Sequence, residues 1–166
     1  HRAHLDSIKH KSGNNVAILS FIVQDAQQQP IVEASNDWSL LREELLRLKW
    51  IDGRALEFAY SSKGISLLEA EIVTALADVA FQKLVKVNPY RYSTTRVNAH
   101  VEENALIAAK IAGLLAQRFD PEMPLDDGTY KQRQLEITKE IETTVDLEDA
   151  RTVLNCLVNL VDSVYR

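Results

Sequence analysis

Residues 64–86 read GISLLEAEIVTALADVAFQKLVK, and this stretch decides the fold class of the chain. Ser66 and Glu69 form a capping box, because the serine side chain can accept from the amide of the third helical residue while the glutamate reaches back to the serine N–H. The Asn-Pro pair at 88–89 ends the helix, since the residue before a proline is pushed away from helical dihedrals. We therefore predict a helix from Ser66 to about Lys86. Its expected apolar side consists of Leu68, Ile72, Leu76, Val79 and residues 81–84.

Helical patterns continue downstream of this stretch. Residues 93–119 are predicted to be helical, either as one helix or as two pieces that meet near residues 98–100. The apolar residues of the stronger part are Leu106, Ile107, Ala109, Ile111, Leu114 and Leu115. A loop over residues 120–128 follows, and the next amphipathic helix is marked by Tyr130, Ile137, Ile141 and Val145.

A last helix closes the chain. We expect Asp146 to cap it, with Asp149 at the third helical position. Its apolar stripe consists of Ala150, Val153, Leu154, Leu157, Val161 and Val164. From Ser66 onward the sequence therefore predicts a body of four or five packed helices.

The N-terminal third has a different pattern. Residues 16–23, VAILSFIV, are the best strand in the sequence, and residues 31–34 fit a short second strand that could pair with it antiparallel. A helix over about 38–50 follows, ended by Asp52-Gly53, and residues 54–65 are expected to connect it to the helical body. The predicted fold class is mainly α: a small α/β edge of two strands plus a helix over 1–53, which could be the end of a larger unit, and a helical domain over 54–166.

Composition narrows the function classes. The chain has 166 residues and a net charge of -5, and residues 65–166 carry eleven basic against sixteen acidic side chains. An acidic helical half repels phosphate backbones, so we expect no nucleic-acid partner. The longest apolar runs fall well short of the ~20 residues of a membrane span, so we expect no membrane partner. The lone Cys156 fits a cytoplasmic protein and cannot form an intramolecular disulfide.

The usual signatures of catalysis and cofactor binding are missing from the sequence. It has no G-x-G-x-x-G and no G-x-x-x-x-G-K-[ST], so we expect no nucleotide cofactor to bind this segment. It has no G-x-S-x-G elbow, and Cys156 lies among leucines and valines, as a buried thiol does. We therefore predict no catalytic residue and no cofactor-binding residue.

Metal binding is not expected either. His1, His4 and His10 fall in what we interpret as a terminal tail. His100 and Glu103 could share a helical face, but the second Glu-x-x-His pair of a di-iron bundle is missing. Adjacent acidic residues usually solvate a helix surface, because neighbouring positions point about 100° apart. Such pairs are Glu43-Glu44, Glu102-Glu103 and Asp126-Asp127.

One cluster could bind a ligand. The basic residues Lys83, Lys86, Arg91 and Arg96 gather around the connector Tyr90-Arg91-Tyr92. Aromatic residues among basic ones can stack on bases or bind an anion. Four positive charges spread over fourteen positions of the acidic C-terminal part are more typical of an ordinary protein surface. We favour that interpretation.

Several segments together resemble one protein family. They are residues 64–72 (GISLLEAEI) continuing through Ala80-Phe81, the Tyr92-Ser93 step, residues 114–121 (LLAQRFDP), the terminal run 146–166, and residues 45–50 (LLRLKW). The pattern is similar to the helical region just upstream of the catalytic domain in the large bacterial NAD-dependent glutamate dehydrogenases. In that family a glycine turn opens one helix, a Tyr/Phe-Ser step starts another, and a helix ends in Arg-Phe-Asp-Pro.

The resemblance covers residues 36–166 and carries several implications. The parent protein would oxidatively deaminate glutamate to 2-oxoglutarate with NAD, whereas this segment would hold neither the nicotinamide-binding glycines nor the catalytic lysine. The strands at 16–35 would be the edge of a regulatory module, and Arg166 would lie short of the catalytic domain. Partners would be the remainder of the parent chain and other subunits.

Two alternatives stay open on the sequence alone. The first is a stand-alone helical module that binds a protein partner through its apolar faces, which predicts an exposed apolar patch. The second is a small-ligand sensor that uses the α/β edge and the Tyr90-Arg91-Tyr92 connector.

Overall fold

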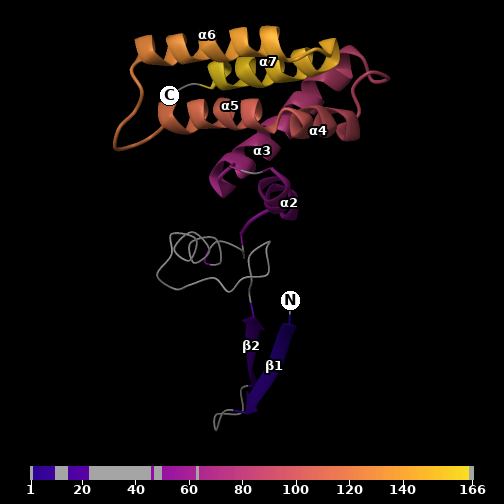
Figure 1. Cartoon of the computed structure of the whole chain (residues 1–166), viewed down its shortest axis with the longest axis vertical. Helices are drawn as coiled ribbons and strands as arrows, with labels where there is room; N and C mark the ends of the chain where they lie inside the picture. Colours follow the sequence, from indigo (N-terminus) through magenta and orange to yellow (C-terminus); the bar gives the residue numbers. More distant parts are fainter. Residues whose placement is uncertain (1, 10–14, 23–45, 47–49, 63, 165–166) are drawn as a thin grey trace. The chain divides into compact units, whose positions relative to one another are not determined.

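The computed structural model describes residues 2–9, 15–22, 46, 50–62 and 64–164, and the chain forms two compact units, His1–Lys49 and Trp50–Arg166. In the first unit, β1 (Arg2–Lys9) pairs antiparallel with β2 (Asn15–Ile22), with Arg2 opposite Ile22 (Figure 1). Residues 2–9, which include His4, therefore lie in a strand and not in a terminal tail. The strand expected at 31–34 and the helix expected at 38–50, apart from Leu46 and Trp50, lie outside the described residues. The α/β edge of two strands plus a helix thus stays a prediction.

The described part of the second unit is helical. It contains α2 (Gly53–Ser61), α3 (Leu67–Val87), α4 (Thr94–Glu103), α5 (Ala105–Arg118), α6 (Asp127–Thr144) and α7 (Glu148–Ser163). Figure 1 shows α5, α6 and α7 running side by side, while α3 packs against α2, α4, α5 and α7. The prediction that the chain is mainly α is confirmed for this unit. Among the described residues, none of these helices is long and apolar enough to cross a bilayer.

The sequence analysis did not predict α2, the first helix of this unit. Residues 54–65 were expected to be a connecting segment, but most of them form α2, and Asp52 is the N-cap of this helix. The Asp52 side chain accepts from the Arg54 amide at 2.9 Å, which satisfies one of the free N–H groups at the helix start. Ala55 and Phe58 are buried against the core, and their burial holds this short helix in place.

The long helix α3 starts as predicted, and its buried side matches the predicted one in part. Leu76 and Leu84, both expected on the apolar side, are buried. The Ser66 N–H donates to Glu69 Oε2 at 2.8 Å and the Glu69 N–H donates to Ser66 Oγ at 3.3 Å, so the capping box is present. Leu68 and Val79, both expected in the core, are 47% and 41% exposed. The buried stripe consists of Leu67, Ala70, Val73, Leu76, Ala77, Ala80 and Leu84. Three alanines in this stripe let neighbouring helices approach closely. Hydrophobicity alone does not predict this close packing.

The next two helices meet at Asn104, four residues beyond the predicted break. The Asn104 side-chain amide donates to the His100 carbonyl at 2.8 Å, and its N–H donates to the Val101 carbonyl at 3.2 Å, which turns the chain out of α4. In α5 the expected Ile107, Ala109, Ile111 and Leu114 are buried and Leu115 is partly buried, whereas Leu106 is exposed. The hydrogen bond from the Asn104 side chain to the preceding turn explains why α4 ends at residue 103 and not at the predicted break near 98–100.

The last two helices complete the core. Tyr130, Ile137, Ile141 and Val145 of the α6 segment are buried, as predicted. The N-cap of α7 is Leu147 and not Asp146, and this cap forms no side-chain hydrogen bond. Val164, expected in the stripe of α7, is the exposed C-cap. The largest fully buried side chains of the described core are Ile111, Ile141, Leu154, Leu157, Val73, Val97, Val153 and Val161.

Candidate functional site

The tyrosine connector, our sequence candidate for ligand binding, is largely occupied by contacts within the chain. Tyr92 is buried in the core, whereas Tyr90 is 93% exposed. The Arg91 guanidinium donates to the Asp149 carboxylate and lies 3.6 Å from that of Glu148. The hydrogen bond from Arg91 holds the pKa of the Asp149 carboxyl below its usual range.

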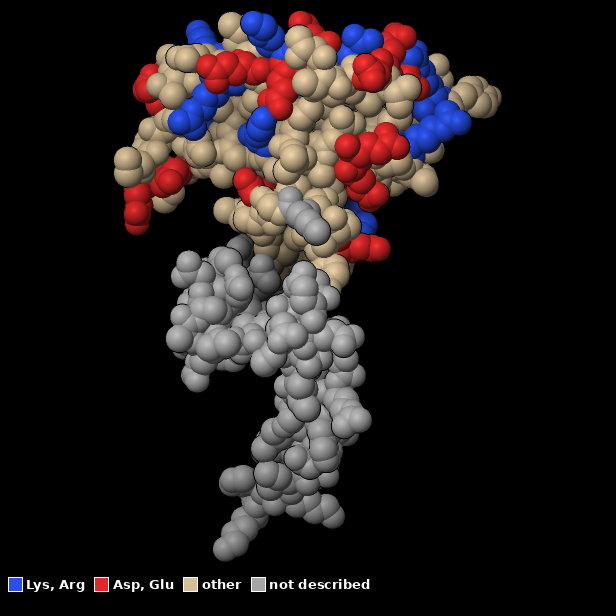
Figure 2. All heavy atoms as spheres, in the orientation of Figure 1, with Lys and Arg blue, Asp and Glu red and all other residues tan. Residues whose placement is uncertain are grey.

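The other basic residues do not complete a platform there. Arg96 Nη1 donates to the carbonyl oxygens of Tyr90 at 3.2 Å and Arg91 at 3.4 Å. Lys83 and Lys86 are exposed on α3. Figure 2 shows acidic and basic side chains interspersed over the visible face of the helical unit. The connector therefore joins helices, and the Tyr90 ring is its exposed aromatic group.

His100 and Glu103 come together as their spacing predicts, but only as a pair. The distance from His100 Nδ1 to Glu103 Oε2 is 3.6 Å, longer than a hydrogen bond. His100 Nδ1 is buried without a hydrogen-bond partner. Within the described residues, no group of three or more His, Cys, Asp or Glu side chains could hold a metal ion.

Cys156 lies on α7, partly buried and packed against the core. Burial raises the pKa of its thiol, because the low-dielectric surroundings disfavour the thiolate. A nucleophilic cysteine needs the opposite shift, so this position suits packing and not chemistry.

The adjacent acidic pairs have separate local roles. The Asp126 carboxylate caps α6 by accepting from the amides of Gly128 at 2.9 Å and Thr129 at 3.0 Å. Glu102 lines a cavity, whereas its neighbour Glu103 faces His100. Glu43 and Glu44 lie outside the described residues. The divergence of neighbouring side chains on a helix explains why Glu102 and Glu103 do not act together.

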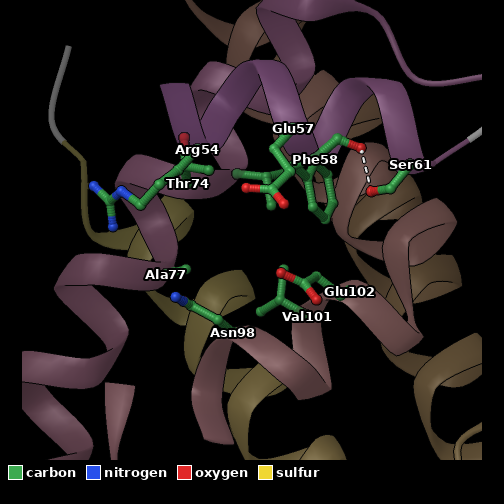
Figure 3. Close-up of a pocket in the computed structure, with 10 residues that line it drawn as sticks. Arg54, Glu57, Phe58, Ser61, Thr74, Ala77, Asn98, Val101 and Glu102 are labelled. Carbon is green, nitrogen blue, oxygen red and sulfur yellow. Dashed lines mark hydrogen bonds between the residues drawn. The ribbon is translucent and has the colours of Figure 1, made fainter. Parts of the chain in front are cut away.

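A cavity of about 330 Å³ lies between α2, α3 and α4 (Figure 3). Its apolar lining consists of Phe58, Val73, Ala77 and Val101. Its polar lining consists of Arg54, Glu57, Ser61, Thr74, Asn98 and Glu102. Sequence analysis could not find this cavity, because one of its three walls is α2, which was not predicted.

A wider and more open groove of about 610 Å³ runs between α5 and α6. Ala109 and Gly113 line it with little side-chain bulk, and Leu106 is exposed at it. Lys110 Nζ bonds Glu140 Oε1 at 2.6 Å across the groove. This ion pair joins α5 to α6 and neutralises the two charges.

The outer side of α3 carries a second apolar stripe, which we call the α3 outer face. It consists of Leu68, Ile72, Ala75 and Val79, spaced by four, three and four positions. At 3.6 residues per turn these positions lie roughly opposite the buried stripe. Leu68 is 47% exposed, Val79 is 41% exposed and Ala75 is exposed, whereas Ile72 is partly buried against the core, so part of this stripe faces solvent.

Comparison with protein-family models, with curated proteins and with solved structures found no match.

Proposed function

We propose that this chain is a non-catalytic helical segment of a large NAD-dependent glutamate dehydrogenase, in which it spaces and docks regulatory modules. The parent enzyme would convert glutamate to 2-oxoglutarate and ammonia with NAD, using catalytic and cofactor residues outside this segment. The observation that carries the proposal is the family-like pattern of residues, whose members lie at the starts and ends of helices.

The glycine turn and the Tyr-Ser step support the proposal. Gly64 has a φ of 88°, a left-handed conformation that favours glycine, and it lies two residues before Ser66, the N-cap of α3. Tyr92 is buried, and the Ser93 side chain accepts from the Arg96 amide at 3.3 Å to begin α4. These residues determine where α3 and α4 begin. This structural role is a reason for proteins with the same helices to share the glycine turn and the Tyr-Ser step.

The Arg-Phe-Asp-Pro segment has a comparable role at the end of α5. Phe119 is the C-cap, and Asp120 Oδ1 accepts from the Glu122 amide at 2.8 Å to shape the following loop. The Arg118 guanidinium lies 4.3 Å from the centre of the Tyr130 ring on α6 and donates to the Val161 carbonyl of α7 at 3.4 Å. One arginine thus ties three helices together.

The α3 outer face supports a role in assembly. Exposed apolar side chains on one helix face are typical of a surface that another polypeptide covers. In the proposed parent, the remainder of the chain or another subunit would cover it.

The same surface favours one alternative, a stand-alone helical protein-interaction module. The two functions differ in the length of the native polypeptide, which would be near that of this chain for the module and several hundred residues longer for the dehydrogenase.

Calorimetric titration of the chain with NAD and with glutamate tests the non-catalytic assignment. We expect no heat of binding from either. Micromolar binding of NAD or glutamate would overturn the assignment of the active site to another part of the protein.

A further inference from the structure

We propose that the α3 outer face binds the same face of a second copy of this chain, with the two α3 helices antiparallel. The proposal names the partner of one surface of this chain and does not depend on the function proposed above.

The α3 outer face continues beyond its apolar residues toward the end of the helix. Gln82 and Lys86 follow Val79 by three and seven positions, and both are exposed. Outward positions spaced by four and three residues therefore run along most of the 21 residues of α3. This is the spacing with which two helices pack along a shared seam.

Trp50 enlarges the apolar surface beside Ala75. It is 79% exposed, and together with Ala75 and Asp78 it lines a hollow of about 260 Å³. A large aromatic side chain at a hollow is typical of the anchor residues of protein interfaces. A side chain of a partner helix can enter the hollow, as a knob enters a hole between paired helices.

The charges of α3 identify the partner. The acidic residues of this helix are Glu69, Glu71 and Asp78, and its basic residues, Lys83 and Lys86, follow all of them. Two such helices attract each other when antiparallel, because each acidic end then meets a basic end. Parallel helices would place like charges against each other. The face is thus complementary to itself, as an interface with two-fold symmetry requires.

One register brings the apolar residues of the two copies together. A two-fold axis beside Ala77 places Val79 of the second copy opposite Ala75, where the hollow can receive its side chain. The same contact occurs a second time with the copies exchanged, because a two-fold interface repeats every contact.

This register also pairs the charges at the two ends of α3. Lys83 of the second copy comes to lie beside Glu69. Glu69 Oε2 accepts from the Ser66 N–H at 2.8 Å, and Oε1 of the same carboxylate can accept from an ammonium. Lys86 of the second copy lies opposite Leu68, whose exposed side chain its carbon chain can cover while its charge stays in water.

The two copies of Asp78 lie near the axis but do not oppose this pairing. Arg54 Nη1 and Nη2 donate to Asp78 Oδ1 and Oδ2 at 2.9 and 2.8 Å. Each carboxylate therefore brings its own neutralising guanidinium to the interface.

Sedimentation equilibrium of the full chain tests the proposal. This face offers fewer than the roughly 20–30 residues that each side of a standard interface engages, so we expect a dissociation constant on the order of 10–100 µM. The mass should rise from 18.7 kDa toward twice that value as the concentration increases to about 500 µM.

A matched pair of substitutions tests the apolar seam. Val79→Glu places a carboxylate at the centre of the interface and should weaken association at least about tenfold. Leu135→Glu makes the same kind of change at a residue of α6 that is 70% exposed, and should leave association unchanged. Circular dichroism of each variant confirms that it is folded.

A second matched pair tests the charges. The double variant Lys83→Glu, Lys86→Glu should weaken association at least about fivefold, because the ends of α3 then repel each other. The double variant Lys131→Glu, Lys139→Glu makes the same change in net charge at exposed lysines of α6 and should have no effect. A role of Lys83 and Lys86 in favouring the helix dipole alone would change stability but not association.

The orientation is measured with a spin label on Val87→Cys in a chain that also carries Cys156→Ser. Val87 is 80% exposed and ends α3 ten positions beyond Ala77. Antiparallel helices place the two labels about 30 Å apart along the helix axes, whereas parallel helices place them side by side. This measurement needs no change at the interface and therefore decides the proposal even if an interface variant fails to fold.

The proposal is overturned by any of four results. They are a monomer at every concentration, equal weakening by Val79→Glu and Leu135→Glu, equal weakening by the two double lysine variants, and labels that lie side by side. A monomer at every concentration would assign the α3 outer face to a different polypeptide.

Discussion

Arg91, in the connector between α3 and α4, donates to the carboxylate of Asp149 in the first turn of α7, 58 positions along the chain. This bond gives the central arginine of the basic and aromatic connector a partner within the chain. It also explains why Asp149, expected at the third position of α7 as part of its cap, instead holds a neighbouring segment. An acidic residue in this first turn is further favoured by the positive end of the helix dipole.

The Arg91–Asp149 bond makes stability depend on pH. The pKa of Asp149 in the folded chain lies below its usual value, and the unfolded chain has the usual value of about 3.9. The contribution is therefore fully present above the unfolded pKa and is lost as the pH falls through the folded pKa.

We expect the free energy of unfolding of the unaltered chain to fall more steeply below about pH 4 than that of Asp149→Asn. Urea unfolding at a series of pH values, followed by circular dichroism, measures the difference. Glu142→Gln is the control and should follow the unaltered chain. Parallel curves for Asp149→Asn and the unaltered chain would show that the bond contributes nothing.

Two leucines of α3 test which side of this helix is buried. Leu76 is 8% exposed and Leu68 is 47% exposed. Leu76→Ala should lower the free energy of unfolding by about 2–5 kcal/mol, because it removes buried methyl groups and leaves a cavity. Leu68→Ala should cost less than about 1 kcal/mol, since much of its side chain is already in water. Equal losses in chemical unfolding would contradict the assignment of the α3 outer face.

The helix caps give a second matched pair. Ser66→Ala removes the side chain that accepts from the Glu69 amide and should cost about 1 kcal/mol. Asp146→Ala should change the free energy of unfolding by less than about 0.5 kcal/mol, because Leu147 and not Asp146 is the cap of α7. Thermal and urea unfolding of both variants measure this. If Asp146→Ala lowered the free energy of unfolding more than Ser66→Ala, Asp146 would be the cap of α7, as the sequence predicts.

Cys156 should react slowly with a thiol reagent in the native chain. Its pKa is raised by burial, so little thiolate is present at neutral pH. The reaction should become fast and complete in denaturant, and Cys156→Ser serves as the blank. Rapid reaction of the native chain would mean that the thiol is exposed and activated.

The sequence predicted those features of the fold that rest on local chemistry. The capping box of Ser66 and Glu69 and the buried stripe of α6 follow from spacing and side-chain type, and both are present. The buried side of α3 was predicted only in part. Leu76 and Leu84 are buried as expected, whereas Leu68 and Val79 are exposed, because the alanines at 70, 77 and 80 pack into the core instead. The start of α2 was missed because Asp52-Gly53 was interpreted as a helix end.

The cavity between α2, α3 and α4 could not be predicted for a related reason. Glu57 and Glu102 are far apart in the sequence and line the same cavity because α2 packs against α3. The partnership of Arg91 with Asp149 is equally non-local. The sequence predicts helix ends and apolar helix faces. Which charged residues of different helices pair depends on how those faces pack in three dimensions.

The mass of the native polypeptide tests the proposal that these helices belong to a much longer dehydrogenase. An antibody raised against residues 50–166 can detect that polypeptide in a denaturing gel of the source cells. We expect a band several times heavier than the 18.7 kDa of this chain, from a reading frame with a dinucleotide-binding fingerprint downstream. A native band near 18.7 kDa would contradict the claim and favour the stand-alone interaction module.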